Sequence, residues 1–267
     1  MRFFNVETQT YPCVIHANGS SKKKNRPGFE SWIITQNYLK NMKETNEIIR
    51  DDLTIVTWKG GKYSGVETIL EYSCNKYGVP LTILPWPSHI SDFWEGSKAK
   101  IYETLKAIES GIIDTKYMMA LDAGDVALLD HPNNILDKFL NEFKGYKAVW
   151  NAEANNWPST TATTKYVHYP KLDEYLIKIT KRDDELKQKL GSRFAYMNTG
   201  CTIGETDSYR SFYKNGLDLG MNLNVVDQAL GKVSQFIEPE NHAIDRECKI
   251  FQCLYGVTSD TLKVFGD

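Results

Sequence analysis

The amino-acid sequence predicts a single α/β domain built on a mostly parallel sheet. Short apolar runs of strand length alternate with segments of helical periodicity through the first 150 residues. The chain has 267 residues, which suits one large domain, and neither an internal repeat nor a linker divides it. Hydrophobic residues make up 41% of the chain and charged residues 25%, the proportions of an ordinary globular protein.

The first half of the chain supplies most of the predicted sheet. Apolar and β-branched runs predict strands at 11–16, 53–58, 80–84, 117–121 and 146–151. Apolar residues spaced three or four positions apart predict helices at 64–77, 98–110 and 133–143. Gly78 and Gly111 follow the first two of these helices and act as stop signals. Ligands of such folds bind outside the carboxyl ends of the strands.

The second half of the chain is less regular. Residues 157–169 are rich in Thr and aromatic residues, 172–190 and 224–236 have helical patterns, and 194–204 has the pattern of strand–turn–strand. We expect residues from about 151 to 260 to form the acceptor half of a pocket, and residues from about 50 to 150 to form its donor-binding half. Both belong to one domain of residues 1–267.

Composition excludes several classes of protein. The net charge of −2 argues against a protein that binds nucleic acid over its whole surface. No apolar run approaches the roughly 20 residues of a membrane span, and the first residues lack a signal-peptide core. We therefore expect a soluble cytoplasmic protein, which includes a viral or phage protein in its host. Five cysteines without a CxxC pair indicate free thiols, not a disulfide framework or a zinc knuckle.

The strongest local signal is an apolar strand that runs directly into two carboxylates. Residues 118–121 are apolar, and Asp122 and Asp125 follow with Ala123 and Gly124 between them. Mg²⁺ and Mn²⁺ commonly join such carboxylates to substrate phosphates, so a metal site is one interpretation. A simple turn is the other, because Asp and Gly are also turn formers.

A second signal lies near the start of the chain. The strand at 11–16 ends in His16, and a loop of small residues leads from Ala17 to Lys22. Backbone N–H groups of such a loop hold phosphates, Lys adds a charge, and His ligates transition metals. A structural histidine is the more common alternative. The exposed cations that follow, Lys23, Lys24 and Arg26, suit a solvated loop or a phosphate-bearing acceptor.

A third signal is the segment 151–158, which follows a predicted strand. Its acid, amide and aromatic groups suit sugar recognition, because Trp157 can stack on a sugar face while Glu153 binds hydroxyls. The alternative is an Asn-rich loop with a core Trp. Two further segments, 196–204 with Asp227–Gln228 and 245–252, carry little information in isolation.

Taken together, these segments resemble the glycosyltransferase domain of the procollagen lysyl hydroxylase/glycosyltransferase family. The shared order is Asp-x-x-Asp, Ala-Glu-x-x-x-Trp-Pro, Asn-[Ser/Thr]-Gly-x-x-Ile-Gly, Asp-Gln and Ile-Phe-Gln, and it covers nearly the whole chain. The resemblance implies a GT-A fold, a Rossmann-like mixed sheet flanked by helices. It also implies a UDP-sugar donor and a Mn²⁺ (or Mg²⁺) cofactor held by a DxD-type motif.

The resemblance also implies a circular permutation. The counterpart of His16–Lys22 comes last in the family, after Ile-Phe-Gln, whereas here it comes first and makes 1–49 a permuted metal- and phosphate-binding segment. Residues 261–265 resemble the strand that precedes it in the family. Because permutation needs neighbouring termini, we predict that the two ends of the chain lie together and that Ile15 pairs in a sheet.

The resemblance assigns the following roles to residues of this sequence. The metal ligands are Asp122, Asp125 and His16. The donor-binding residues are Thr57 at the uridine, Lys100 near the donor, and Asn18, Gly19 and Lys22 at the phosphates. The residues around the transferred sugar are Asp227, Glu153, Trp157 and Asn198.

Two departures from the family pattern concern the donor. The family has a uracil-stacking aromatic residue between its two metal aspartates, where this chain has Gly124. Either another residue, such as Trp58, supplies the platform, or the preference for uracil does not carry over. The family's run of acidic residues is reduced here to Asp227. The family's hydroxylase part is absent from these 267 residues, so the acceptor does not carry over.

The predicted activity is metal-dependent, retaining transfer of a hexose or pentose from a UDP-sugar to an acceptor hydroxyl. Three acceptor classes stay open: hydroxylysine or a sugar on a collagen-like protein, another glycan or lipid-linked sugar, and a hydroxymethylated DNA base. The alternatives to transfer are a catalytically inactive protein that binds nucleotide sugars or glycans, and a metal-dependent nucleotide hydrolase.

Overall fold

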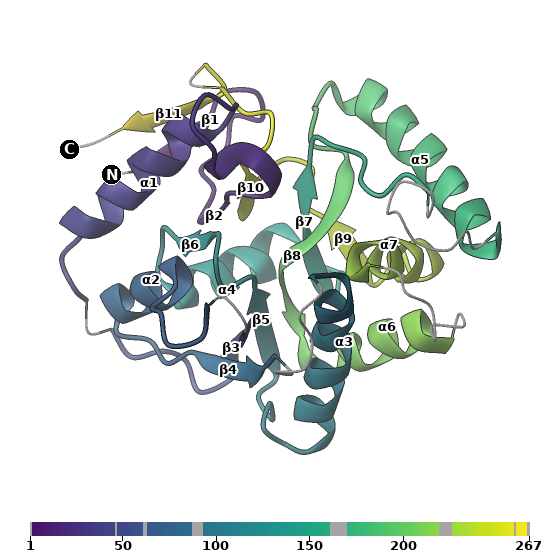
Figure 1. Ribbon diagram of the computed structural model, residues 1–267, viewed down its shortest axis with the longest axis horizontal. Coiled ribbons are helices and arrows are strands. Elements are labelled where there is room, and N and C mark those ends of the chain that lie inside the picture. The colour runs from purple at the N-terminus through teal and green to yellow at the C-terminus, as the bar shows by residue number, and fades with distance from the viewer. Residues whose placement is uncertain are drawn as a thin grey trace.

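A computed structural model describes residues 2–45, 47–60, 63–86, 93–160, 170–218, 226–258 and 260–265 of the chain. Within them a six-stranded sheet forms the centre, and helices pack on both of its faces (Figure 1). A three-stranded sheet and a two-stranded ribbon lie beside it. The predicted fold class is therefore confirmed as a mixed α/β sheet flanked by helices.

The described elements alternate along much of the chain. The strands are β1 (Arg2–Asn5), β2 (Val14–His16), β3 (Leu53–Lys59), β4 (Thr82–Pro85), β5 (Tyr117–Leu121), β6 (Val126–Leu128), β7 (Ala148–Glu153), β8 (Tyr196–Glu205), β9 (His242–Ile244), β10 (Phe251–Cys253) and β11 (Leu262–Phe265). The helices are η1 (Gly19–Lys22), α1 (Phe29–Asn41), α2 (Ile69–Tyr77), α3 (Phe93–Glu109), α4 (Pro132–Glu142), α5 (Pro170–Leu190), α6 (Thr206–Asp218) and α7 (Asp227–Ile237).

The central sheet has the order β4-β3-β5-β8-β7-β9. Its strands pair in parallel except at β8, which is antiparallel to both of its neighbours, β5 and β7. The sheet is thus mostly parallel, as predicted. The reversal of β8 has one consequence for the site, because the beginning of β8 meets the carboxyl ends of β5 and β7 at one edge.

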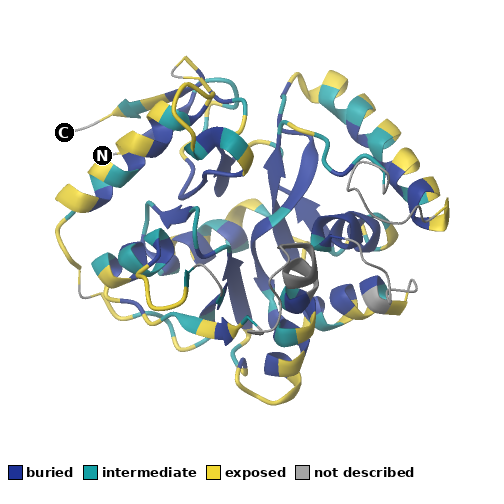
Figure 2. Ribbon diagram, viewed as in Figure 1, coloured by how far each residue is buried: buried dark blue, intermediate teal, exposed yellow. Residues whose placement is uncertain are grey.

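Both faces of the central sheet are buried. Along β5, Met118 and Ala120 belong to one core, whereas Met119 and Leu121 belong to the other. Residues of α3, α6 and α7 pack in the first core, and residues of α2 and α4 pack in the second. Figure 2 shows the buried strands between helices whose outer sides are exposed. A strand in this position can be apolar throughout, as β5 is, because neither of its faces meets water.

The smaller sheets bring the ends of the chain together. β1 pairs with β11 in antiparallel register, with Arg2 opposite Phe265, and the marked termini are neighbours in Figure 1. β2 lies between β10 and β6, where Ile15 pairs with Gln252 and Ala127. The predicted proximity of the termini and the pairing of Ile15 are both confirmed. The circular permutation itself stays a prediction.

Helix boundaries differ from the predicted ones where capping decides them. The helix predicted from 64 begins at Ile69 because Thr68 caps it. The Thr68 hydroxyl accepts a bond from the Glu71 N–H at 3.2 Å, and the Glu71 carboxylate accepts one from the Thr68 N–H at 2.7 Å. This capping box satisfies N–H groups that have no partner inside the helix. The predicted helix 98–110 begins earlier, at Phe93.

The predicted strand–turn–strand at 194–204 is wrong. These residues form the single long strand β8, and the irregularity is a register shift opposite Trp150 and Asn151 of β7. A β-bulge of this kind bends a strand without ending it. Of the segment 157–169, residues 161–169 lie outside the described part of the chain, as do residues 224 and 225 of the predicted helix 224–236.

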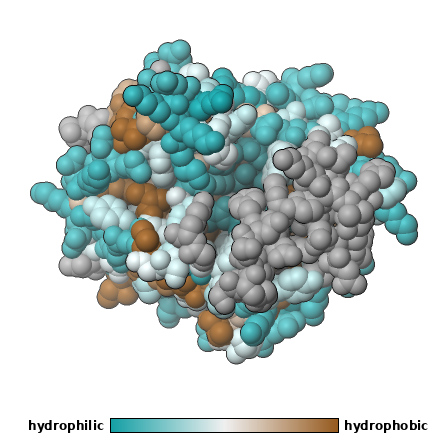
Figure 3. Space-filling view, in the orientation of Figure 1, coloured by the Kyte–Doolittle hydropathy of each residue, from teal (hydrophilic) through white to brown (hydrophobic). Residues whose placement is uncertain are grey.

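The face of the molecule shown in Figure 3 is mostly hydrophilic. Hydrophilic side chains gather in the upper part of this view, and apolar side chains occur in small groups. Exposed apolar residues such as Ile33, Ile48 and Ile112 come from different elements. Scattered exposure of this kind is usual for folded proteins.

Candidate functional site

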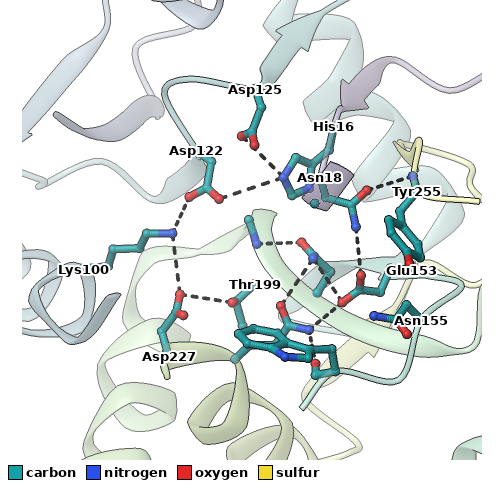
Figure 4. Close-up of a pocket in the computed structure, with 15 residues that line it drawn as sticks. His16, Asn18, Lys100, Asp122, Asp125, Glu153, Asn155, Thr199, Asp227 and Tyr255 are labelled. Carbon is teal, nitrogen blue, oxygen red and sulfur yellow. Dashed lines mark hydrogen bonds and ion pairs between the residues drawn. The ribbon is translucent and has the colours of Figure 1, made fainter. Parts of the chain in front are cut away.

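A pocket of about 380 Å³ lies at the edge of the central sheet where β5, β7 and β8 meet. Its size is within the range of small-molecule sites. Figure 4 shows polar side chains from widely separated segments pointing into it. The lining residues are His16, Asn18, Gly19, Lys100, Asp122, Asp125, Glu153, Asn155, Trp157, Asn198, Thr199, Gly200, Asp227, Gln228 and Tyr255.

One corner of the pocket gathers an imidazole and two carboxylates. His16 Nε2 lies 3.5 Å from Asp125 Oδ1 and 4.0 Å from Asp122 Oδ2. One ligand atom from each of the three residues lies within 4.8 Å of the others. Strand register produces this meeting, because His16 pairs with Val126 and the Ala17 N–H donates to the Asp125 carbonyl at 2.7 Å. Asp122 is placed by β5, and its N–H donates to the Gly200 carbonyl at 2.8 Å.

Gly200 allows this corner to form. A Cβ at this position would lie 2.9 Å from Asp122 Oδ2 and would overlap the His16 ring. The backbone of β8 therefore passes directly beneath the imidazole and the carboxylate. Any larger residue would push the His16 and Asp122 side chains away from each other.

Two lysines neutralise the aspartates. Lys100 Nζ lies 2.5 Å from Asp122 Oδ1 and 3.6 Å from Asp227 Oδ2, and Lys22 Nζ lies 2.5 Å from Asp125 Oδ2. Burial raises the pKa of Asp125, but His16 and Lys22 lower it by more, so the net shift is downward. Burial and the nearby Asp125 raise the pKa of Asp122 despite Lys100. Burial lowers the pKa of Lys100, but Asp122 and Asp227 raise it by more.

The opposite corner of the pocket is built on one buried carboxylate and three amides. Glu153 is 4% exposed and accepts bonds from Asn18 Nδ2 at 2.8 Å, Asn198 Nδ2 at 3.3 Å and Gln228 Nε2 at 2.5 Å. Burial raises the pKa of Glu153, although the amide donors and Lys232 oppose that shift. The bonds fix the amides around the carboxylate, which leaves a rigid polar wall.

The loop after β7 is held from α7. Lys232 is 1% exposed, and its Nζ donates to Asn156 Oδ1 at 2.9 Å and to the Pro158 carbonyl at 3.2 Å. Gln228 Nε2 donates to the Trp157 carbonyl. Burial lowers the pKa of Lys232 to about 8. These bonds fix the backbone on both sides of Trp157, whose side chain lines the pocket.

The residues of the first corner fit a divalent cation of intermediate hardness. Two carboxylates supply the oxygen ligands that Mg²⁺ and Mn²⁺ favour, and the imidazole nitrogen suits Mn²⁺ better than Mg²⁺. The three side chains meet at one place, and Asp122 and Asp125 are partly accessible from the pocket. His16, Asp122 and Asp125 could therefore hold such an ion.

The structure brings eleven of the twelve sequence-predicted site residues to the pocket or its edge. Ten line it, and Lys22 reaches its edge through Asp125. Thr57 stays apart: it is fully buried, and its hydroxyl donates to the Leu121 carbonyl at 2.7 Å. This placement does not favour a direct contact between Thr57 and a ligand, because its hydroxyl already bonds across the β3–β5 pair.

The placement of Trp58 does not favour a platform for uracil. Trp58 is 6% exposed, and its Nε1 donates to Thr104 Oγ1 at 3.0 Å, so the indole belongs to the core. The ring beside the aspartates is instead that of Tyr63. A Cβ on Gly124 would overlap the Tyr63 side chain, so the glycine makes room for an aromatic ring from another segment.

Sequence reasoning missed several lining residues. Thr199, Gly200, Gln228, Asn155 and Tyr255 line the pocket without having been singled out, although all but Tyr255 lie in segments that the motifs marked. The Tyr255 N–H donates to Asn18 Oδ1 at 3.0 Å, and its ring lies against Gly19. The signal that could have pointed to Tyr63 is Gly124, because the missing side chain between the two aspartates leaves space for a ring from another segment.

No protein-family model matches the chain. An uncharacterized protein of Acanthamoeba polyphaga mimivirus is 28% identical over 165 residues, which cover 62% of this chain and 30% of that protein. The chain thus matches less than a third of the length of that relative.

The solved structures that match the chain include a distant one. It is the crystal structure of a glycosyltransferase involved in the glycosylation of the major capsid of PBCV-1, with 12% sequence identity and a TM-score of 0.38. The match covers 72% of this chain and 80% of that one. This likeness is too distant to assign an activity.

None of the described helices is both long enough and apolar enough to cross a membrane.

Proposed function

We propose that the protein is a metal-dependent glycosyltransferase of the GT-A type, which moves a sugar from a UDP-sugar to an acceptor hydroxyl. One observation carries the proposal. A corner suited to a divalent cation and a corner suited to sugar hydroxyls share one pocket, and each is assembled from segments far apart in the chain. A diphospho-sugar has the same two parts, an anionic diphosphate and a polyhydroxylated ring.

The diphosphate belongs at the charged corner. His16, Asp122 and Asp125 would hold Mn²⁺ or Mg²⁺, which when bound neutralises the diphosphate leaving group. Lys22 and Lys100 already lie at this corner and donate to phosphate oxygens once the donor displaces their carboxylate partners. The N–H groups of the small-residue loop that includes Asn18 and Gly19 add further donors.

The sugar belongs against the amide corner. Glu153 orients Asn18, Asn198 and Gln228, whose remaining donors and acceptors bind hydroxyl groups. Trp157 offers an aromatic face to the sugar ring. A dense set of fixed polar groups beside one aromatic face suits a hexose or pentose better than an apolar ligand.

Transfer with retention needs charge stabilisation more than proton transfer by the protein. The acceptor hydroxyl attacks from the side of the departing β-phosphate oxygen, the bond to that oxygen breaks, and the hydroxyl proton passes to the phosphate. Asp227 lies between Lys100 and Thr199, with its carboxylate 3.6 Å from Lys100 Nζ and 3.1 Å from Thr199 Oγ1. In this role its negative charge stabilises the developing positive charge at the anomeric carbon.

The base of the donor has a candidate platform in Tyr63. Its ring lies over Gly124, between the two metal aspartates of the sequence. A nucleobase stacked on Tyr63 would lead its phosphates toward Asp122 and Asp125. Aromatic stacking tolerates different bases, so the preference for uracil rests on the resemblance alone.

The acceptor stays open among the three classes that the sequence left. Lys23, Lys24 and Arg26 are exposed and follow directly after η1, whose Gly19 lines the pocket. This charge favours an acceptor that carries phosphates, such as DNA with a hydroxymethylated base. If so, the affinity for duplex DNA falls steeply as salt rises, because phosphate contacts release counterions.

The proposal is tested by nucleotide release. The purified protein is mixed with UDP-, GDP- and ADP-sugars, with Mn²⁺ or with EDTA, and free nucleotide is measured. Slow release that requires Mn²⁺ and one UDP-sugar supports the proposal. Fast hydrolysis without an acceptor supports a nucleotide hydrolase. Thermal stabilisation by UDP and Mn²⁺ without release indicates a binding protein. If UDP and Mn²⁺ neither stabilise the protein nor lead to nucleotide release, the proposal is refuted.

A further inference from the structure

The two nitrogens of His16 have different surroundings. Nε2 faces Asp122 and Asp125, whereas Nδ1 faces away from the pocket toward Asn151 and Cys253. Asn151 Nδ2 lies 3.2 Å from His16 Nδ1, and Cys253 Sγ lies 3.7 Å from it. Both neighbours are fully buried, so water does not compete for Nδ1.

The carboxamide of Asn151 is only half satisfied. Its Nδ2 also lies 3.1 Å from Cys253 Sγ, but its Oδ1 is buried and has no hydrogen-bond partner. A buried acceptor without a partner destabilises the fold, so one of this kind calls for an explanation. The amide oxygen and nitrogen have almost the same shape, and a half-turn of the carboxamide exchanges their positions.

The orientation of this carboxamide decides which nitrogen of His16 has a free lone pair. With Nδ2 toward the ring, Asn151 donates to Nδ1, and the ring proton must then be on Nε2, facing Asp125. A cation bound at Nε2 needs the lone pair there, which moves the proton to Nδ1. That Nδ1–H requires an acceptor, and ligating histidines usually find one in a neighbouring carbonyl or carboxylate.

We propose that Asn151 is a positioning residue for the cation site and that its carboxamide turns when a cation binds. In the turned orientation Oδ1 accepts the Nδ1–H of His16, while Nδ2 takes the position that has no partner, so the gain lies in the bond to the protonated Nδ1. Cys253 is a weaker substitute, because a thiol sulfur accepts hydrogen bonds poorly. The inference rests on the proposed function, since it requires a cation at His16.

Two nearly isosteric variants separate the hydrogen bond from the packing. Asn151→Asp keeps an acceptor toward His16 Nδ1, whereas Asn151→Leu removes it. We measure the dissociation constant for Mn²⁺ alone from the electron paramagnetic resonance signal of free Mn²⁺. We expect Asn151→Leu to weaken Mn²⁺ binding about 10- to 100-fold and Asn151→Asp to stay within roughly threefold of the unmodified protein.

Thr202→Val is the matched control, because Thr202 is also buried in the central sheet but bonds to the Val149 carbonyl and Tyr209. It should leave Mn²⁺ affinity unchanged, and thermal unfolding shows that each variant is folded. A folded Asn151→Leu that binds Mn²⁺ as tightly as the unmodified protein overturns the inference and leaves the proposed function intact. An unmodified protein that fails to bind Mn²⁺ overturns both.

A spectroscopic measurement remains decisive if Asn151→Leu does not fold. With Cd²⁺ as a diamagnetic substitute, ¹H–¹⁵N spectra of the labelled histidines report which nitrogen of His16 carries the proton. The inference requires Nδ1–H in the unmodified protein when Cd²⁺ is bound. A proton on Nε2 under the same conditions contradicts it.

Discussion

The two corners of the pocket are built in opposite ways. At the charged corner, Asp122 and Asp125 are held by lysines, and each lysine reaches in from a partly exposed position. At the amide corner, Glu153 is held by three neutral donors and is almost fully buried. Ion pairs between flexible side chains rearrange at little cost, whereas a buried amide network does so only with the loss of several bonds.

This difference indicates which part of a donor each corner serves. A diphosphate brings its own charge and cation, so its corner must exchange partners when it binds. A sugar ring brings hydroxyl groups whose positions decide specificity, so its corner must be fixed in advance. Substitutions at the charged corner should therefore reduce activity with little effect on stability, and substitutions at the amide corner should reduce both.

The largest effect is expected for Asp125→Asn. The variant removes one of three candidate cation ligands, and we expect Mn²⁺-dependent UDP release to fall by about 1,000-fold or more. The midpoint of thermal unfolding should fall by less than about 4 °C, because relief of the repulsion between Asp122 and Asp125 partly offsets the lost pairing with His16 and Lys22. Asp137→Asn is the control, since Asp137 is exposed and pairs with Arg50. Full activity of Asp125→Asn would refute the cation assignment.

Glu153→Gln should affect both properties. The new amide nitrogen faces the donors of Asn18, Asn198 or Gln228, so we expect a loss of about 2 kcal/mol in the free energy of unfolding and roughly 100-fold slower turnover. Denaturant unfolding and UDP release measure the two effects. Glu142→Gln, at a partly exposed position, serves as the control. Unchanged stability would mean that the two corners do not differ as described.

Lys232 gives the amide corner a pH dependence. Its pKa is about 8 in the folded protein and about 10.5 in the unfolded chain, so between these values the unfolded state binds more protons. The free energy of unfolding should therefore rise with pH in this window, by at most about 1.4 kcal/mol per pH unit, relative to Lys232→Met. Denaturant unfolding of both proteins at pH 7.5, 9 and 10 tests this, and parallel curves would contradict it.

The smallest effect is expected at Tyr63. Tyr63→Ala removes the ring beside Gly124 and should weaken UDP binding about tenfold, whereas Tyr63→Phe keeps the ring and should bind UDP within about twofold of the unmodified protein. Isothermal titration calorimetry with UDP and Mn²⁺ measures both. Equal affinity of Tyr63→Ala and the unmodified protein would exclude Tyr63 as the platform for the base.

Much of the fold and of the pocket was predictable from local patterns. The strand 117–121 has the predicted bounds, because an all-apolar run that ends in Asp122 leaves little choice of structure. The motif residues His16, Asp125 and Glu153 were identified from their chemical type and from the strand that precedes each. Local patterns do not show where distant contacts bury a side chain, as for Trp58 and for Thr57, whose hydroxyl donates to the Leu121 carbonyl of the neighbouring strand.

The sequence by itself determined many of the elements, their order and the polar groups that follow the strands, since apolar periodicity and capping act over a few residues. Only the tertiary structure decided which groups meet. Lys22 and Asp125 are 103 positions apart, and Asn18 and Glu153 are 135 apart. The reversal of β8, the ring of Tyr63 over Gly124 and the half-satisfied Asn151 all depend on strand pairing between distant segments, which no local pattern records.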